Sequence, residues 1–89
     1  MSRELLSAEN SFHTAIPIGE PVEIEAKVRY RAQAAEAVLL RINEQESKVT
    51  FKAPQRAVTP GQSVCYYIKD RVIGGGVINK VKKAVFNEK

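Results

Sequence analysis

The chain has 89 residues, a formal net charge of +4, one cysteine and one histidine. This length allows one small domain that buries about 60–65% of its unfolded surface, and a single cysteine and histidine exclude a disulfide framework or a multi-ligand zinc site. No apolar run approaches a membrane span and no signal peptide is evident at the N-terminus, so we expect a soluble, cytoplasmic protein with no membrane partner.

The positive charge is concentrated in the second half of the chain. Residues 1–44 carry five basic and seven acidic side chains, whereas residues 45–89 carry nine basic and three acidic ones. The halves therefore differ in sign, at −2 and +6. Such asymmetry is compatible with a polyanionic partner, although many small basic domains have none.

Residues 1–20 are poorly patterned, and we expect them to be a lead-in segment. His13 lies here without a neighbouring cysteine, aspartate or second histidine, which favours an ordinary surface position over a general base or metal ligand. The pattern becomes clear after Pro21, because apolar residues alternate with charged ones from Val22 to Arg31. This alternation predicts a half-buried strand whose outer face is first acidic and then basic.

Residues 32–43 are ambiguous, because they combine strong helix formers with an alternating pattern. Clear strands flank them on both sides, so we favour a strand that forms a hairpin with the preceding one. After a polar connection over residues 43–47, Val49 and Phe51 are expected to face inward.

The most informative stretch follows, from Phe51 to Val64. Pro54 lacks a backbone donor and is expected to end a strand, which leaves Gln55 and Arg56 on an exposed loop. Pro60 and Gly61 occupy the two central positions of Thr59–Gln62 and predict a type II turn, since proline presets φ near −65° and glycine supplies the positive φ.

Residues 63–68 favour a strand, in which Cys65 is expected to be a small buried residue because no base adjoins it in sequence. Residues 69–71 read as a hairpin connection. The glycines that follow lack the spacing of a nucleotide-binding loop, so a strand bulge or a close backbone approach is the better interpretation. They are Gly74, Gly75 and Gly76.

Together these segments predict an all-β fold, a small antiparallel β-barrel of about five or six strands. We assign residues 1–20 to the lead-in, 21–79 to the barrel, and 80–89 to a basic C-terminal tail or last strand. No catalytic or metal-binding constellation is found.

Three motifs, Ala26–Arg31, Pro54–Gln62 and Gly74–Ile78, resemble in order and spacing the C-terminal domain of the bacterial tRNA-specific 2-thiouridylases. The resemblance covers roughly residues 17–78 and implies a β-barrel that helps to hold tRNA. In that family an N-terminal ATP-pyrophosphatase domain, using ATP with Mg, activates the wobble uridine for 2-thiolation, and cysteines relay sulfur received from a sulfur-carrier protein.

The resemblance also implies that the catalytic parts lie outside this chain, in the N-terminal and central domains of the same enzyme. The chain has neither the nucleotide loop nor paired cysteines, needs no cofactor of its own, and should be inactive alone; Met1 would then begin an excised domain. Cys65 replaces a residue that is usually aliphatic in the family, so it inherits no catalytic role.

We expect tRNA to be contacted by basic and polar side chains on the strand predicted over residues 22–31 and beside the Pro-Gly turn: Lys27, Arg29, Arg31, Gln55 and Arg56. Tyr30, Tyr66 and Tyr67 could stack on an exposed base, although at least one of them should pack in the core. Two alternatives stay open: a purely structural barrel that packs on the preceding domain, and a stand-alone barrel resembling those of translation factors.

Overall fold

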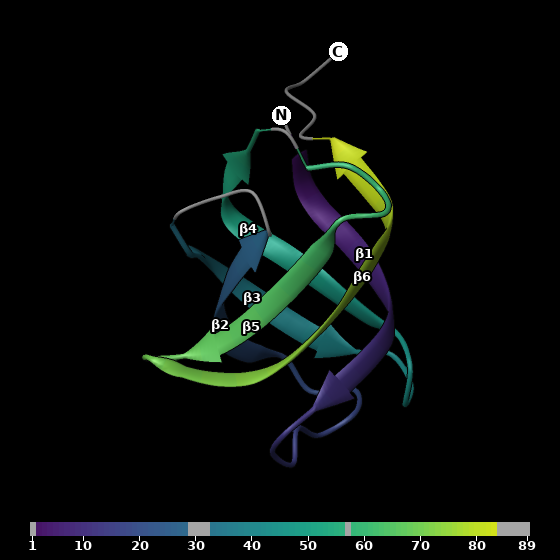
Figure 1. Ribbon diagram of the computed structural model, residues 1–89, viewed down its shortest axis with the longest axis vertical. Coiled ribbons are helices and arrows are strands. Elements are labelled where there is room, and N and C mark those ends of the chain that lie inside the picture. Colours follow the sequence, from purple (N-terminus) through teal and green to yellow (C-terminus); the bar gives the residue numbers. More distant parts are fainter. Residues whose placement is uncertain (1, 29–32, 57, 84–89) are drawn as a thin grey trace.

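A computed structural model describes residues 2–28, 33–56 and 58–83 and shows a closed antiparallel barrel (Figure 1). Around the ring the strands follow the order β1-β4-β3-β2-β5-β6, and β6 pairs again with β1. The prediction of a small antiparallel β-barrel is therefore confirmed. The strands are β1 (Ser2–Phe12), β2 (Val22–Val28), β3 (Ala35–Arg41), β4 (Ser47–Gln55), β5 (Ser63–Ile68) and β6 (Arg71–Lys83).

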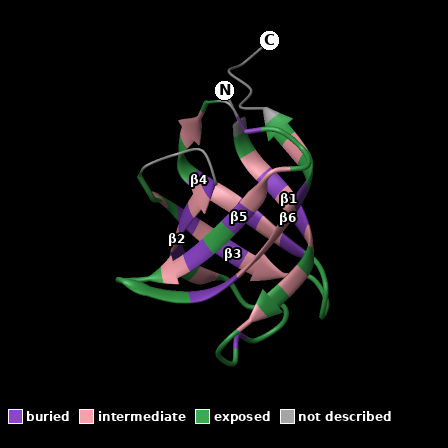
Figure 2. Ribbon diagram, in the orientation of Figure 1, coloured by how far each residue is buried: buried purple, intermediate pink, exposed green. Residues whose placement is uncertain are grey.

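The core fills the inside of the ring and follows the alternation in the sequence. Buried residues occupy alternate positions in the central parts of β2, β3, β4 and β5, so buried and more exposed segments alternate along these ribbons (Figure 2). Val49 and Phe51 face inward as predicted, with exposed fractions of 0% and 1%. Further core side chains are Leu5, Ile24, Ala26, Val28, Ala37, Leu39, Val64, Tyr66, Ile73 and Ile78.

The ambiguous segment forms strand β3, as the sequence analysis favoured. Ala37 pairs with Ile24 of β2 on one side and with Phe51 of β4 on the other. Helix propensities differ by at most about 0.7 kcal/mol per ordinary residue, so hydrogen bonding on both sides and burial of Leu39 outweigh them.

The expected lead-in contains a full barrel strand, β1, which pairs with both β4 and β6. Its pattern is obscured because the inward position after Leu5 is taken by a polar residue, Ser7, which is 1% exposed. Glu9 has a positive φ of 53°, and the register with β6 shifts three times along the strand. A strand so interrupted carries no regular alternation in its sequence.

The Pro-Gly turn forms as predicted. Gly61 has φ of 94°, and the amide of Gln62 donates to the carbonyl oxygen of Thr59 at 3.4 Å. The prediction that Pro54 ends the preceding strand is wrong, because β4 continues to Gln55. Between the pairs Glu4–Thr50 and Ser2–Gln55 the register of β1 and β4 shifts, so Pro54 lies in an irregular stretch of the ladder, where a missing donor is tolerated.

The triple glycine lies inside β6, which confirms the structural interpretation. A Cβ atom on Gly75 would lie 2.6 Å from the carbonyl oxygen of Val64, and one on Gly74 would lie 2.5 Å from that of Ser11. Both distances are far below van der Waals contact, so neighbouring strands approach β6 too closely for any side chain there. The hairpin connection before it is confirmed for Lys69 and Asp70, whereas Arg71, expected in the connection, is the first residue of β6 and pairs with Ile68.

Cys65 is exposed, so the prediction of a buried cysteine is wrong. Its neighbours Val64 and Tyr66 both face the core. The alternation along β5 therefore turns Cys65 outward.

Candidate nucleic-acid interface

Lys27 lies on the outer face of β2, one residue before the strand ends. It is partly exposed and pairs with Cys65 of β5. Its predicted orientation is confirmed by the burial of Ala26 and Val28 on either side. Arg29 and Arg31, predicted to continue this basic face, lie outside the described residues, as does Tyr30.

Gln55 is the last residue of β4, and Arg56 follows it with an exposed side chain. The Gln55 side chain donates from Nε2 to the carbonyl oxygen of Ala53 at 2.8 Å. This bond occupies one of its two amide protons, so the side chain keeps one donor and its acceptor for a ligand.

Barrel topology brings Lys27, Gln55 and Arg56 to one end of the molecule. Because neighbouring strands are antiparallel, β2, β4 and β6 all run toward this end, and their arrows point upward in Figure 1. β3 lies between β2 and β4 in the ring. The end therefore carries cations at separate points of its rim.

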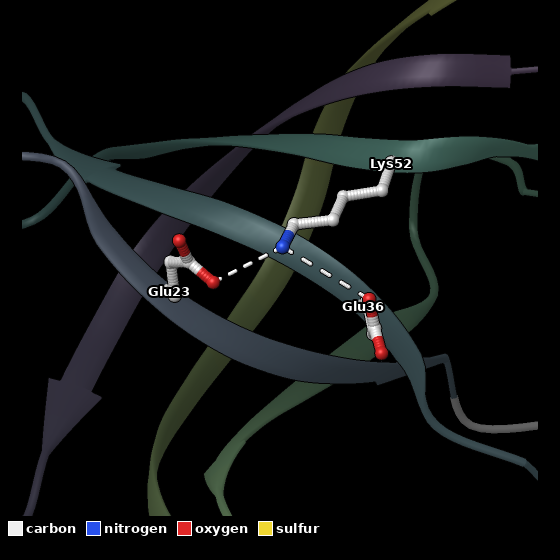
Figure 3. A network of polar contacts seen from close by, with 3 residues as sticks. All are labelled: Glu23, Glu36 and Lys52. Atoms are coloured by element: carbon white, nitrogen blue, oxygen red, sulfur yellow. Dashed lines mark hydrogen bonds and ion pairs between the residues drawn. The ribbon is translucent and has the colours of Figure 1, made fainter.

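The outer face of β2, β3 and β4 has mixed charge. The Nζ atom of Lys52 lies 3.0 Å from Oε1 of Glu23 and 3.9 Å from Oε1 of Glu36, and Figure 3 shows the lysine reaching between the two carboxylates. The hydrogen bond to Glu23, together with the charges of both glutamates, raises the pKa of Lys52 above 10.5. These carboxylates balance Lys52, so this face offers little net positive charge to a polyanion.

A second group of basic residues, which the sequence patterns did not indicate, lies on the wall formed by β4, β1 and β6. Lys48 and Lys80 are the direct partners of Leu6 in its two neighbouring strands. Lys82 follows on β6, opposite Glu4. We call Lys48, Lys80 and Lys82 the lysine wall.

A one-residue bulge in β6 turns two of these lysines outward. Leu6 pairs with Lys80 and Ser7 with Ile78, so Asn79 has no partner in β1. Ile78 is buried, and strict alternation would place Lys80 and Lys82 inside with it. The extra residue reverses the phase: both lysines are exposed, and Val81 packs against the core. The sequence shows the alternation of polar and apolar residues across Asn79–Lys82. Which of these side chains point outward, however, depends on the bulge.

Tyr66 is fully buried, which confirms that at least one tyrosine packs in the core. Its hydroxyl donates to Asn10 Oδ1 at 2.9 Å and lies 2.5 Å from Ser7 Oγ, and its ring stacks on Phe12 with centroids 5.8 Å apart. Burial raises its pKa from 10.0 to about 12. Tyr66 is therefore unavailable to a nucleic-acid base, whereas Tyr67 is partly exposed.

Candidate catalytic residues are sparse. His13 is exposed, as predicted, and its backbone amide donates to the carbonyl oxygen of Ile73 at 2.8 Å. Over residues 2–28, 33–56 and 58–83, no group of three or more His, Cys, Asp or Glu side chains is placed to hold a metal ion. Within the same ranges no helix is long and apolar enough to cross a membrane.

Comparison with known proteins places this barrel in a family. Residues 2–78 match the model of the aminomethyltransferase beta-barrel domain. The chain is similar to the tRNA-specific 2-thiouridylase MnmA of Clostridium acetobutylicum (44% identity over 75 residues, 84% of this chain and 21% of the relative) and of Desulforamulus reducens (46% over 80 residues, 90% and 22%). The corresponding enzyme of Acetivibrio thermocellus is 44% identical over 77 residues, which are 86% of this chain and 21% of the relative.

The chain thus spans about a fifth of the length of the curated relatives it matches. The resemblance carried by the three sequence motifs is confirmed. The chain belongs to the aminomethyltransferase beta-barrel domain family, in the form that resembles the C-terminal barrel of tRNA-specific 2-thiouridylases.

Proposed function

We propose that this chain is the barrel of a tRNA 2-thiouridylase and helps to hold tRNA for the catalytic part of the enzyme. The observation that carries the proposal is similarity to tRNA-specific 2-thiouridylases over 84–90% of the chain. The basic residues at one end of the barrel support it, because phosphate contacts from lysine and arginine provide most of the affinity for nucleic acid.

The reaction itself belongs to the rest of the enzyme in this proposal. With one cysteine and no nucleotide-binding loop in its sequence, the chain leaves ATP and Mg binding, sulfur relay and 2-thiolation of the wobble uridine to the N-terminal and central domains. A sulfur-carrier protein would supply those domains. A cytoplasmic location, where tRNA is found, is part of the same proposal.

The contacts would be divided by chemistry. Lys27, Arg29, Arg31 and Arg56 would bind phosphate groups, which position the RNA without reading its sequence. Gln55 would add a polar contact to the sugar or phosphate through its remaining amide proton. Tyr67 is the described tyrosine whose exposure allows stacking on a base.

The test is binding of this chain to an unmodified tRNA that carries a wobble uridine, titrated from low to near-physiological salt. We expect log K to fall by roughly 0.7–0.9 per phosphate contact for each decade of salt. The double variant Arg29→Ala/Arg56→Ala in the full enzyme should bind more weakly and with a flatter slope. Lys52→Ala is a control for the loss of a cation that is already paired, because Lys52 forms an ion pair with Glu23. An absence of binding even at low salt would reject the proposal.

One observation favours a structural role as the second candidate. Ile18 and Ile42 are 50% and 48% exposed, and they come from neighbouring segments of the chain, because Ile18 forms a bridge with Arg41, the residue before Ile42. Exposed apolar residues of this kind can pack against another domain of a longer chain. If they do, Ile18→Ser/Ile42→Ser should lower the Tm of the full enzyme more than that of the isolated barrel.

A further inference from the structure

The lysine wall gathers three positive charges on one side of the barrel. Within the described ranges, Lys48, Lys80 and Lys82 form no ion pair, whereas Lys52 is paired twice. Strand β1 adds Arg3, Glu4 and Glu9 to this side of the barrel, with Glu4 opposite Lys82. These three residues and the lysine wall together carry four positive and two negative charges, a net charge of +2, while the outer face of β2 carries Glu23, Glu25 and Lys27.

The spacing of these lysines follows from the strand register. Lys48 and Lys80 flank Leu6 in adjacent strands, so their Cα atoms lie about 10 Å apart across β1. Lys80 and Lys82 are two residues apart along β6, or about 6.6 Å. Three ammonium groups at these separations repel one another, and an extended anion that passes over β1 would relieve the repulsion.

The surface between the lysines is concave. A depression of about 550 Å³ lies over β1 and β6, and its lining includes Leu6, Glu4 and all three lysines. Its lining thus combines apolar side chains, among them Leu6 and Val81, with three cations. The sugar rings and phosphates of an RNA strand suit such a combination.

We propose that the lysine wall binds the sugar-phosphate backbone of RNA and is the main RNA-contacting face of the barrel. This inference rests on the proposed function, because it assumes that the barrel binds tRNA. It places the main RNA contact on a different wall from the one that carries Lys27. In the six-strand ring β1 lies opposite β2. Lys82 is near the barrel end that carries Gln55 and Arg56, because Ser2 pairs with both Gln55 and Lys83, so the two basic regions adjoin.

An acidic protein surface is the competing occupant, and the composition of the wall argues against it. Lysine is depleted at protein–protein interfaces relative to the rest of the surface, because its flexible, strongly hydrated side chain is costly to immobilise. The same side chain binds phosphates as a mobile point charge without being desolvated. RNA backbone is therefore the better match.

The experiment compares two variants of this chain that lose the same charge. Lys48→Gln/Lys80→Gln/Lys82→Gln removes the wall, and Lys52→Gln/Lys69→Asn/Arg71→Gln removes three cations elsewhere; asparagine is chosen because Lys69 has a positive φ of 56°. The probe is the unmodified tRNA, with binding measured as a function of salt. Thermal unfolding of each variant establishes that it is folded.

Each phosphate contact raises the affinity for tRNA about fivefold when the salt concentration falls from about 1 M to about 0.1 M. Loss of three contacts should therefore lower the affinity about 100-fold at about 0.1 M salt and reduce the slope of log K against log salt concentration by about 2. The control variant should lose much less. Equal losses in both variants would overturn the proposal, because the effect would then reflect net charge alone.

The outcomes separate this inference from the proposed function. If the lysine-wall variant binds like wild type while Arg29→Ala/Arg56→Ala binds weakly, the wall is refuted and the proposed function stands. If the unmutated chain binds no tRNA at low salt, both fail.

A second measurement needs no variant. Lysine acetylation of the wild-type chain, read by mass spectrometry with and without tRNA, should show protection of Lys48, Lys80 and Lys82 and continued modification of Lys69. Equal modification of the wall lysines in both samples would also refute the inference.

Discussion

Replacing Tyr66 by phenylalanine should destabilise the barrel by removing a polar contact between β5 and β1. The hydroxyl donates to Asn10 Oδ1 at 2.9 Å and lies 2.5 Å from Ser7 Oγ, so it joins β5 to β1. Each buried hydrogen bond contributes about 0.5–1.5 kcal/mol net, which gives a loss of about 1–3 kcal/mol for Tyr66→Phe. The ring remains, so stacking on Phe12 and core volume should be preserved.

The partners of this hydroxyl keep other contacts in the variant. Ser7 Oγ still reaches Asn10 Oδ1 at 3.0 Å and the Ser47 carbonyl at 3.4 Å. The loss should therefore fall within this range rather than above it. For a domain of this size each kcal/mol lowers the Tm by about 4–8 °C.

The same residue makes stability depend on pH in the alkaline range. The pKa of a tyrosine hydroxyl is ordinarily 10.0, and burial in the barrel raises the pKa of Tyr66 to about 12. Between pH 10 and pH 12 the folded state therefore holds a proton that the unfolded state has lost. The contribution of Tyr66 to the free energy of unfolding is therefore fully present below pH 10 and is lost as the pH rises. At pH 12 the free energy of unfolding is about 2 kcal/mol lower. Phenylalanine does not titrate, so the stability difference between wild type and variant should narrow by that amount.

Urea denaturation followed by circular dichroism at pH 8, 10, 11 and 12 measures both effects. Comparison with the variant at each pH cancels the titration of lysines and of the other tyrosines. A variant as stable as wild type at pH 8, or a difference that does not change between pH 10 and 12, would refute this account of the Tyr66 hydroxyl.

Three further predictions concern single sites. Gly75→Ala should cost about 1–3 kcal/mol, because its Cβ would meet the Val64 carbonyl and force the strands apart; an unchanged Tm would contradict the close approach. Cys65 should react with a maleimide in the native chain, since it is exposed, and lack of reaction before unfolding would show it to be covered. Glu23→Gln should lower the pKa of Lys52 toward 10.5 in an NMR titration, because Glu23 is the main cause of its rise; an unchanged midpoint would rule out this ion pair in solution.

Sequence patterns predicted the strands in which alternation is unbroken. In β2 and β4 the apolar residues recur every second position, and both strands face as expected. The Pro60–Gly61 turn was predictable because its requirement for positive φ is local. The glycines of β6 were assigned correctly because they did not match any nucleotide-binding spacing.

The remaining features depend on long-range pairing that a local pattern does not encode. β1 was missed because Ser7 takes an inward position and is hydrogen bonded to Tyr66, 59 residues away. The exposure of Cys65 follows from the facing of Val64 and Tyr66, which the run of strand-favouring residues left undetermined. The lysine wall was missed for the same reason, since its residues come from strands separated in sequence and one of those strands was expected to be a lead-in.

Closure of the ring limits how the barrel can meet any partner. Each of the six strands that the structure describes has a hydrogen-bonded neighbour on both sides, so these strands offer no open edge to which an extended peptide could add. Many β-domains bind peptides, and also aggregate, by adding a strand to an exposed sheet edge. Closure of the barrel suppresses this process. Side chains that project from the walls and the loops at the two ends must therefore determine which partner binds. These parts can change in sequence without opening the ring.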